Sequence, residues 1–383
     1  MDSKLPDIGT TIFAVMTALS AECDAIDLSQ GFPSFNPSQY LLDRVTHHMN
    51  NGANQYAAMT GVPSLRQAIA SKVHNLYGRP VDAETEVTVT DGATEGLFSA
   101  IHATVRVGDE VIVFDPAYDS YEPAVTLAGG TTKHLPLLPP AENADFEIDW
   151  NRLEDAIGPK TRLIILNFPH NPTGAVFSAA DLDRLADIVR DTSIYLLSDE
   201  VYEHIIFEKT EHQSLMRHDE LWERSFVISS FGKTYHATGW KIGYCVAPAM
   251  LSNEFRMIHQ WTCYSVNTPM QLAIADYMQQ APNHYAELPV FYEQKRDRFC
   301  ELVRDSRFAH VPAKGTFFQL LDYSEITDED DVTYARRLTK EIGVASIPIS
   351  VFCEKPFRSK KLRFCFAKDD KILEEAAARL CQL

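Results

Sequence analysis

Between Val87 and Val246 the chain alternates short apolar runs, rich in β-branched residues, with longer stretches of helical period. Buried strands of a parallel sheet have the first pattern, and the helices that connect them have the second. The alternation therefore predicts an α/β fold, with a mostly parallel sheet covered by helices. The expected strands are 87–89, 111–114, 163–166, 194–197, 226–229 and 242–246, with helices at 94–105 and 178–189.

After Val266 the pattern changes. Helices are expected at 269–279 and 285–303, and the second is long enough to link two domains. Strands at 316–320, 345–347 and 362–366, a helix at 332–341 and a closing helix then predict a smaller α+β unit.

Charge and cysteine content narrow the class of protein. A formal net charge of -18 without a run of like charges disfavours nucleic acid and anionic membrane surfaces as partners. Seven cysteines without a C-x-x-C pair suggest neither a disulfide framework nor a zinc site, and fit a reducing cytoplasm. The apolar stretch Ile12 to Leu19 is too short to span a membrane and follows Asp2 and Asp7, so we expect folded protein there, not a signal peptide.

Polar and aromatic residues follow five of the expected strands, at the sheet edge where α/β proteins bind ligands. Each group alone could be a helix cap, a turn, a core residue or a solvated lysine. Five strand ends that all suit one ligand are not explained by those separate roles. In chain order, the groups are Thr90 to Thr94, Asp115 to Tyr118, Asn167 to Gly174, Ser198 to Tyr202, and Ser230 with Lys233 and Lys241.

These groups together match the needs of pyridoxal phosphate. The cofactor requires a phosphate site, a stacking face, hydrogen-bond partners for its ring, an anion beside the ring nitrogen and a lysine amine that forms a Schiff base. A helix that opens with Gly92 suits the phosphate. Asp199 is the candidate that keeps the pyridine nitrogen protonated, and its neighbour Glu200 is expected to point the other way.

Two motifs, Ser230-Phe231-Gly232-Lys233-Thr234 and Thr238-Gly239-Trp240-Lys241-Ile242-Gly243, resemble the lysine motif of class I/II aminotransferases. Within that family the chain is most similar to the bacterial methionine and the kynurenine–glutamine aminotransferases. The shared segments are Ser29 to Pro33, Gln55-Tyr56, Gly92 to Glu95, Asp115 to Tyr121, Asn167 to Gly174, Ser198 to Tyr202 and Leu362 to Ala367. The resemblance implies the fold type I of pyridoxal-phosphate-dependent transferases, with a large domain of residues 36–274 and a small domain of residues 1–35 and 275–383.

The resemblance also implies residue roles at the cofactor. Lys233 would hold pyridoxal phosphate and move the proton between substrate and cofactor, while Asp199 would face the pyridine nitrogen. The remaining cofactor contacts would be Tyr202 and Asn171 at the phenolic oxygen, Tyr118 stacked on the ring, and Gly92, Ala93, Thr94, Ser230 and Lys241 at the phosphate. Many relatives have arginine in place of Lys241, so a point charge replaces a bidentate fork here.

At the substrate, Arg363 matches the family's receptor for the α-carboxylate, assisted by Asn167 and Gly31. Tyr56 matches a residue that reaches the phosphate site of the neighbouring subunit, which implies a homodimer with shared sites. Around the expected mouth lie Phe13, Phe32, Tyr56 and His236 rather than a second arginine.

An apolar mouth favours methionine, aromatic amino acids, leucine or glutamine over aspartate as amino donor, with a 2-oxo acid as acceptor in a ping-pong cycle. Two alternatives remain open. A carbon–sulfur β-lyase could use the same cofactor and lysine. A pyridoxal-phosphate-binding regulator of this family would carry an added basic DNA-binding domain, which disagrees with the acidic composition.

Overall fold

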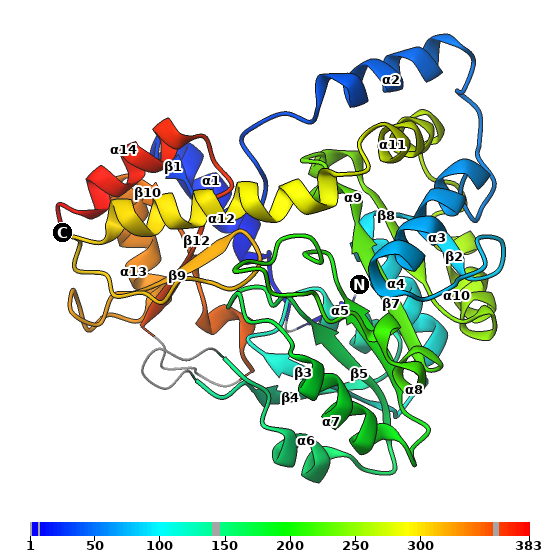
Figure 1. The fold of residues 1–383 in the computed structure, drawn as a ribbon. Coiled ribbons are helices and arrows are strands. Elements are labelled where there is room, and N and C mark those ends of the chain that lie inside the picture. Colours follow the sequence, from blue (N-terminus) through cyan, green and yellow to red (C-terminus); the bar gives the residue numbers. More distant parts are fainter. Residues whose placement is uncertain (1, 7, 140–145, 355–359) are drawn as a thin grey trace.

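The computed structural model describes residues 2–6, 8–139, 146–354 and 360–383. Its centre is a seven-stranded sheet with the order β2-β8-β7-β6-β5-β3-β4 (Figure 1). β8 runs antiparallel to both of its neighbours, and the other pairs are parallel. The strands are β2 (Val87–Asp91), β3 (Glu110–Asp115), β4 (Thr131–Pro136), β5 (Thr161–Asn167), β6 (Tyr195–Asp199), β7 (Ser225–Ser230) and β8 (Ile242–Val246).

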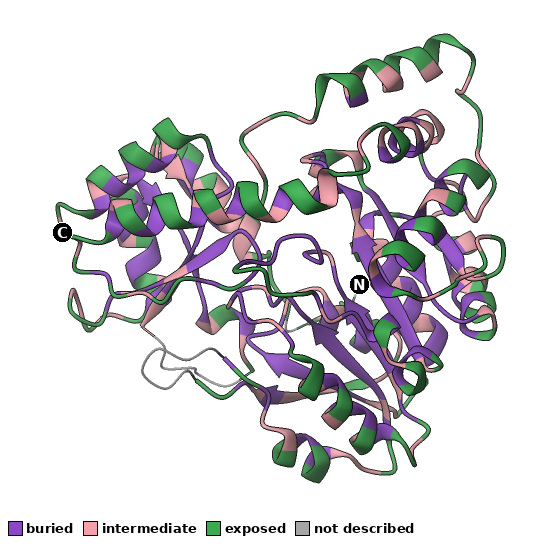
Figure 2. Cartoon of the chain, viewed as in Figure 1, coloured by how far each residue is buried: buried purple, intermediate pink, exposed green. Residues whose placement is uncertain are grey.

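Both faces of this sheet are covered by helices, because alternate strand residues point to opposite sides. Val111 and Val113 join one core with α4 and α10, whereas Ile112 and Phe114 join another with α3, α7 and α11. Figure 2 shows the resulting buried sheet between helices with exposed outer faces. The helices are α3 (Pro63–Tyr77), α4 (Gly92–Thr104), α5 (Tyr121–Leu127), α6 (Trp150–Ala156), α7 (Ala179–Val189), α8 (Asp219–Trp222), α9 (Phe231–Thr234), α10 (Ala249–Thr262) and α11 (Thr268–Gln280).

A third core draws on both ends of the chain. Met16 and Leu28 pack there with residues between Leu288 and Leu380. β1 pairs with β10 in parallel, and β11, β12 and β9 form an antiparallel sheet. In Figure 1, α12 crosses from the side of α11 to the side of α14. The elements are α1 (Ile12–Glu22), β1 (Ile26–Asp27), α12 (His284–Val303), β9 (Phe318–Asp322), α13 (Asp331–Arg337), β10 (Val344–Ala345), β11 (Ile347–Pro348), β12 (Lys361–Cys365) and α14 (Asp370–Leu380). α2 (Gln39–Asn50) connects the two regions.

The predicted α/β class is confirmed, and the six predicted strands of the large sheet are present. The single strand expected at 345–347 is wrong, because the chain changes sheet at Ser346: β10 pairs with β1, and β11 pairs with β12. The strand expected at 316–320 begins later, at Phe318. Among the described residues no helix has the length and apolar character needed to cross a membrane.

Candidate active site

A cavity of about 310 Å³ opens at the carboxyl ends of the central strands and reaches β12. It brings together residues that the sequence analysis took from distant segments. The predicted residues that line it are Phe13, Gly31, Gly92, Ala93, Thr94, Tyr118, Asn167, Asn171, Asp199, Tyr202, Ser230, Lys233, Lys241 and Arg363.

Lys233 lies on α9, the short helix that directly follows β7. Its Nζ donates a hydrogen bond of 2.7 Å to the carbonyl of Gly31 and lies 5.5 Å from the centre of the Tyr202 ring. Burial lowers the pKa of Lys233 to about 8, and the cations Arg363 and Lys241 contribute in the same direction. The amine can therefore act as a nucleophile or base near neutral pH.

Asp199 ends β6 and is 4% exposed. The Tyr121 hydroxyl donates to its Oδ2 at 2.7 Å, and the Val201 amide donates to Oδ1. Burial raises the pKa of Asp199 to about 6, although these hydrogen bonds and the charge of Lys233 oppose the rise. A cationic N–H group brought into the cavity would stabilise the ionised form of this carboxyl group.

Asn167 ends β5, and Asn171 lies in the loop that follows. Asn167 donates from Nδ2 to the carbonyl of Asp199 at 3.0 Å and accepts the Asn171 amide at 3.0 Å. Both ends of the Asn167 side chain are thus used to hold this loop against β6. The Oδ1 of Asn171 accepts a hydrogen bond of 2.7 Å from Arg363, so its NH₂ group is the part that remains for a ligand.

Arg363, on β12, is 1% exposed and brings a buried cation to the cavity. Its Nη2 donates to the carbonyl of Ser29 at 2.8 Å, and its guanidinium lies 3.9 Å from the centre of the Phe318 ring. Nε has no hydrogen-bond partner, and no described acidic side chain forms an ion pair with Arg363. Burial lowers its pKa to about 10, which leaves it charged near neutral pH. A buried cation with an open donor is suited to a carboxylate.

The N-terminus of α4 meets Lys241 at the other end of the cavity. Gly92 has φ +69°, and a Cβ there would lie 2.9 Å from Nζ of Lys241. Lys241 itself adopts a left-handed backbone, with φ 56°. A lysine amine against the free N–H groups of a 13-residue helix is an arrangement that binds phosphate.

Three aromatic residues complete the walls. Burial raises the pKa of Tyr118 to about 12 and that of Tyr202 well above 10, so both phenols remain neutral donors. Sequence reasoning missed Phe318. Its ring lies edge-on to the Tyr202 ring, with 5.8 Å between the ring centres. Tyr121 was also given no role, although it begins α5 three residues after Tyr118; its phenol was the available signal.

Three residues expected near the mouth lie outside the lining of this cavity. Phe32 is 42% exposed, with Nζ of Lys368 4.4 Å from its ring centre. Tyr56 is 82% exposed and packs edge-on against Tyr264. His236 contacts Phe35 edge-on. Their proposed tasks stay predictions.

Residues 24–380 match the family model of class I and II aminotransferases. The chain belongs to this family. It is 52% identical to methionine aminotransferase of Escherichia coli K12 over 100% of this chain and 98% of that protein. It is 32% identical to human kynurenine–oxoglutarate transaminase 3, over 97% and 88% of the two chains.

Solved structures agree with this assignment. The crystal structure of the E. coli methionine aminotransferase superposes with a TM-score of 0.97 and 52% identity, over 100% of this chain and 99% of that one. Thermus thermophilus aspartate aminotransferase with maleate gives a TM-score of 0.90 at 29% identity, over 100% and 99%. The predicted family and fold class are confirmed, and the chain is an aminotransferase. The relatives do not favour the β-lyase alternative.

Proposed function

We propose that this aminotransferase binds pyridoxal phosphate at Lys233 and transfers the amino group of methionine, or of another apolar or aromatic amino acid or glutamine, to a 2-oxo acid. The observation that carries the proposal is that the Lys233 amine and the Arg363 guanidinium line one cavity from α9 and β12, two elements that pack in different cores. One group suits a reactive carbonyl, and the other suits the carboxylate of the same substrate.

The side chains that line the cavity match the groups of the cofactor. Asp199 would pair with the pyridine nitrogen, and Tyr202 with the Asn171 NH₂ group would donate to the phenolic oxygen. Tyr118 would stack on the ring. The phosphate would lie at Gly92, Ala93, Thr94, Ser230 and Lys241, where glycine leaves room for the Lys241 amine. When bound, pyridoxal phosphate supplies a carbonyl that carries the amino group and a ring that withdraws electrons.

The chain's own residues would orient the substrate and move its protons. Arg363 binds the α-carboxylate, with Gly31 and Asn167 beside it. The Lys233 amine, with a pKa of about 8, would take the proton from the substrate's α-carbon and deliver it to the carbonyl carbon of the cofactor. Asp199 stays ionised when it faces a cation, because the opposite charge lowers its pKa from the value of the empty cavity.

Substrate preference follows from the remaining wall. A dicarboxylate needs a second cation beside its side chain, but Phe13, Leu97, Val201 and Phe318 line the cavity near Arg363 and Tyr118. An apolar or thioether side chain suits this wall better. The function named for the E. coli relative supports methionine.

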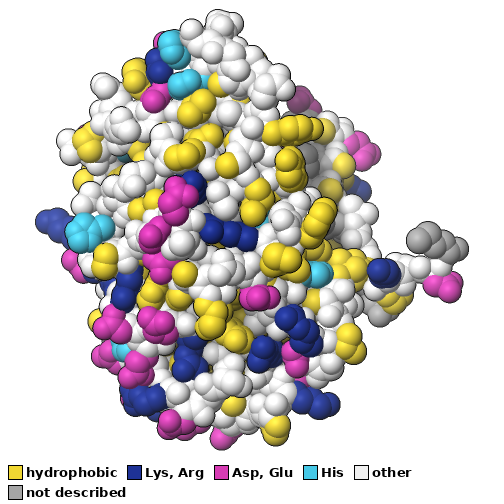
Figure 3. Space-filling model, turned by 90° about the vertical axis from the view of Figure 1, so that its right-hand side faces the viewer, with side chains coloured by type: hydrophobic (Ala, Val, Ile, Leu, Met, Phe, Trp, Pro, Cys, Tyr) yellow, Lys and Arg dark blue, Asp and Glu magenta, His cyan; other side chains and the backbone are white. Residues whose placement is uncertain are grey.

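We also propose a homodimer of two-domain subunits, in which residues 36–274 form the large domain and residues 1–35 and 275–383 the small one. The two cores support this division. Large hydrophobic side chains are exposed on and beside α10, including Met257, Trp261, Tyr264 and Tyr56. Figure 3 shows many hydrophobic side chains on this side of the molecule, with charged groups concentrated toward its lower part. Exposed apolar patches of this kind mark protein interfaces.

An absorbance spectrum of purified protein with added pyridoxal phosphate tests the proposal. We expect a visible band that disappears with L-methionine and returns with a 2-oxo acid, and no such band in Lys233→Ala. Equal conversion by aspartate would overturn the substrate class but keep the cofactor site. Release of pyruvate and ammonia from cystathionine would indicate β-lyase chemistry. A folded protein without any band would overturn the whole proposal.

A further inference from the structure

The turn after β6 presents its side chains to two different sides. Asp199 and Tyr202 line the cavity, whereas Glu200 and Glu203 do not and are only 1% and 3% exposed. A buried carboxylate is costly unless it is paired. The proposed reaction gives neither glutamate a task, so their partners indicate what they hold in place.

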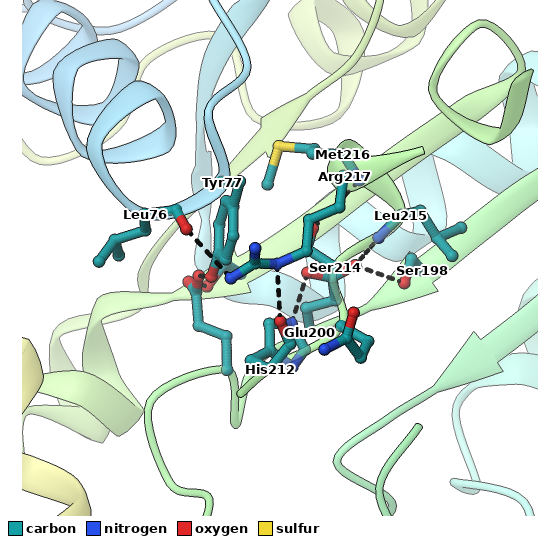
Figure 4. A network of polar contacts seen from close by, with 12 residues as sticks. Leu76, Tyr77, Ser198, Glu200, His212, Ser214, Leu215, Met216 and Arg217 are labelled. Atoms are coloured by element: carbon teal, nitrogen blue, oxygen red, sulfur yellow. Dashed lines mark hydrogen bonds and ion pairs between the residues drawn. The ribbon is translucent and has the colours of Figure 1, made fainter. Parts of the chain in front are cut away.

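Glu200 belongs to a network of polar contacts with residues that do not line the cavity (Figure 4). It accepts hydrogen bonds from the Ser198 hydroxyl at 2.8 Å and the Leu215 amide at 3.1 Å, and lies 2.8 Å from Nε2 of His212. Arg217 then donates to the carbonyl of His212. Apart from Ser198, these partners belong to the segment 212–217, so Glu200 anchors that segment to the end of the sheet.

Glu203 instead joins the elements that support the cavity. Its Oε1 lies 2.6 Å from Nζ of Lys72 and 2.8 Å from the Tyr244 hydroxyl. The hydroxyls of Tyr77 and Ser229 also donate to the carboxylate. These donors come from α3, β7 and β8, so a single carboxylate connects the turn to three elements.

The charge of Glu203 is part of this arrangement. Burial alone would raise its pKa, but Lys72 and His204 and the hydrogen bonds from Lys72 and Ser229 hold it below the usual range. A buried ion pair adds little stability compared with well-packed apolar residues. Its benefit is a defined geometry, because a carboxylate that accepts hydrogen bonds from four side chains on three elements fixes their relative positions.

That geometry is transmitted directly to the cavity. Tyr202 precedes Glu203 in the chain, and Ser230 follows Ser229 at the end of β7, just before the helix that carries Lys233. We propose that Glu203 is a positioning residue: it ties the Tyr202 turn to the end of β7 and so sets the position of Tyr202, whose ring centre lies 5.5 Å from the Lys233 amine. The inference rests on the proposed binding of pyridoxal phosphate at Lys233.

Glu203→Gln tests the proposal in protein loaded with pyridoxal phosphate. The amide keeps the size but removes the charge and turns an NH₂ group toward other donors. We expect the pH midpoint of the visible band to rise by at least ~0.5 units, because a misplaced Tyr202 stabilises the deprotonated cofactor less. We also expect kcat to fall ~10-fold while KM for methionine changes less than ~3-fold, since Arg363 is untouched.

Two further variants separate positioning from stability. Asp331→Asn alters another buried carboxylate, which accepts the Ser350 amide at 2.7 Å and its hydroxyl at 2.6 Å. Asp331→Asn should lower the Tm, but the pH midpoint of the visible band and kcat should be the same as in wild type. Tyr77→Phe keeps the charge of Glu203. It should change the pH midpoint and kcat in the same direction as Glu203→Gln, but by a smaller amount.

The outcomes are distinct. The inference is wrong if Glu203→Gln and Tyr77→Phe lower the Tm but leave the pH midpoint of the visible band and kcat unchanged from wild type. If Glu203→Gln does not fold, Tyr77→Phe decides by the same criteria. If wild-type protein shows no band with pyridoxal phosphate, the proposed function itself fails, and this inference with it.

Discussion

At the scale of single residues, Asp199 carries a buried charge that a cationic group of a ligand would offset. Its pKa of about 6 in the folded chain lies above the ordinary value of 3.8, so the folded protein binds this proton more tightly than the unfolded chain. Ionised Asp199 therefore destabilises the ligand-free fold at pH above 6, and this loss disappears as the pH falls toward 3.8.

We expect Asp199→Asn to raise the unfolding free energy of protein without pyridoxal phosphate, by on the order of 3 kcal/mol at pH 8. The difference from wild type should shrink as the pH falls through 6. Denaturant titrations at several pH values measure both effects. Asp276→Asn is the control with opposite sign, because hydrogen bonds from His48 and Arg44 lower that pKa against the effect of burial. A destabilised Asp199→Asn at pH 8 would contradict the prediction.

Arg363 allows a second test at this scale. Arg363→Lys keeps the charge but loses the planar fork that binds a carboxylate through two parallel hydrogen bonds. We expect KM for methionine to rise ~10- to 100-fold, with pyridoxal phosphate bound as in wild type. Titration of the visible band with methionine and with cofactor measures the two affinities separately. Equal loss of both would show that Arg363 supports the cofactor site instead.

The residues at the strand ends could be predicted from the sequence more easily than the side chains that contact them. Strand ends gave Lys233, Asp199 and the α4 N-terminus, because the edge of a parallel sheet gathers such positions. Tyr121 was missed since its bond to Asp199 depends on the direction of α5. Arg363 was predicted only from the resemblance to the family. Its place in the cavity depends on how β12 packs against the ends of the central strands.

Two features of the fold also lay beyond the sequence pattern. β4 was missed because this edge strand begins with four polar residues, Thr131 to His134, and so has no apolar run. The antiparallel direction of β8 depends on how the chain returns after β7, which local periodicity does not encode.

The start of α4 gives a prediction with a matched control. Gly92→Ala and Gly78→Ala place a Cβ on similar left-handed backbones, with φ +69° and +72°, but only the first meets Lys241; the second points into open space. Both should lose ~1 kcal/mol of stability. Only Gly92→Ala should weaken pyridoxal phosphate binding, measured by fluorescence titration. Equal cofactor affinity in the two variants would remove Lys241 from the phosphate site.

For the whole molecule, the exposed face of α10 tests the proposed dimer. Trp261 is 84% exposed, and Trp261→Glu should give a monomer in sedimentation experiments. Tyr56→Phe should leave the dimer intact but lower the affinity for pyridoxal phosphate, because its hydroxyl is proposed to reach the phosphate of the other subunit. An unchanged dissociation constant for Tyr56→Phe would remove the shared site, and a dimeric Trp261→Glu would place the interface elsewhere.

The pairing of β1 with β10 also sets an order of events during synthesis. Ile26 leaves the ribosome early but pairs with Val344, which follows after on the order of tens of seconds at usual rates of translation. The segment with Phe13 and Gly31, which forms one wall of the cavity, therefore lacks its strand partner while the central sheet is synthesised. Nascent chains that end before Val344 hold Lys233 without that wall, so the reactive amine is enclosed only after β10 has been made.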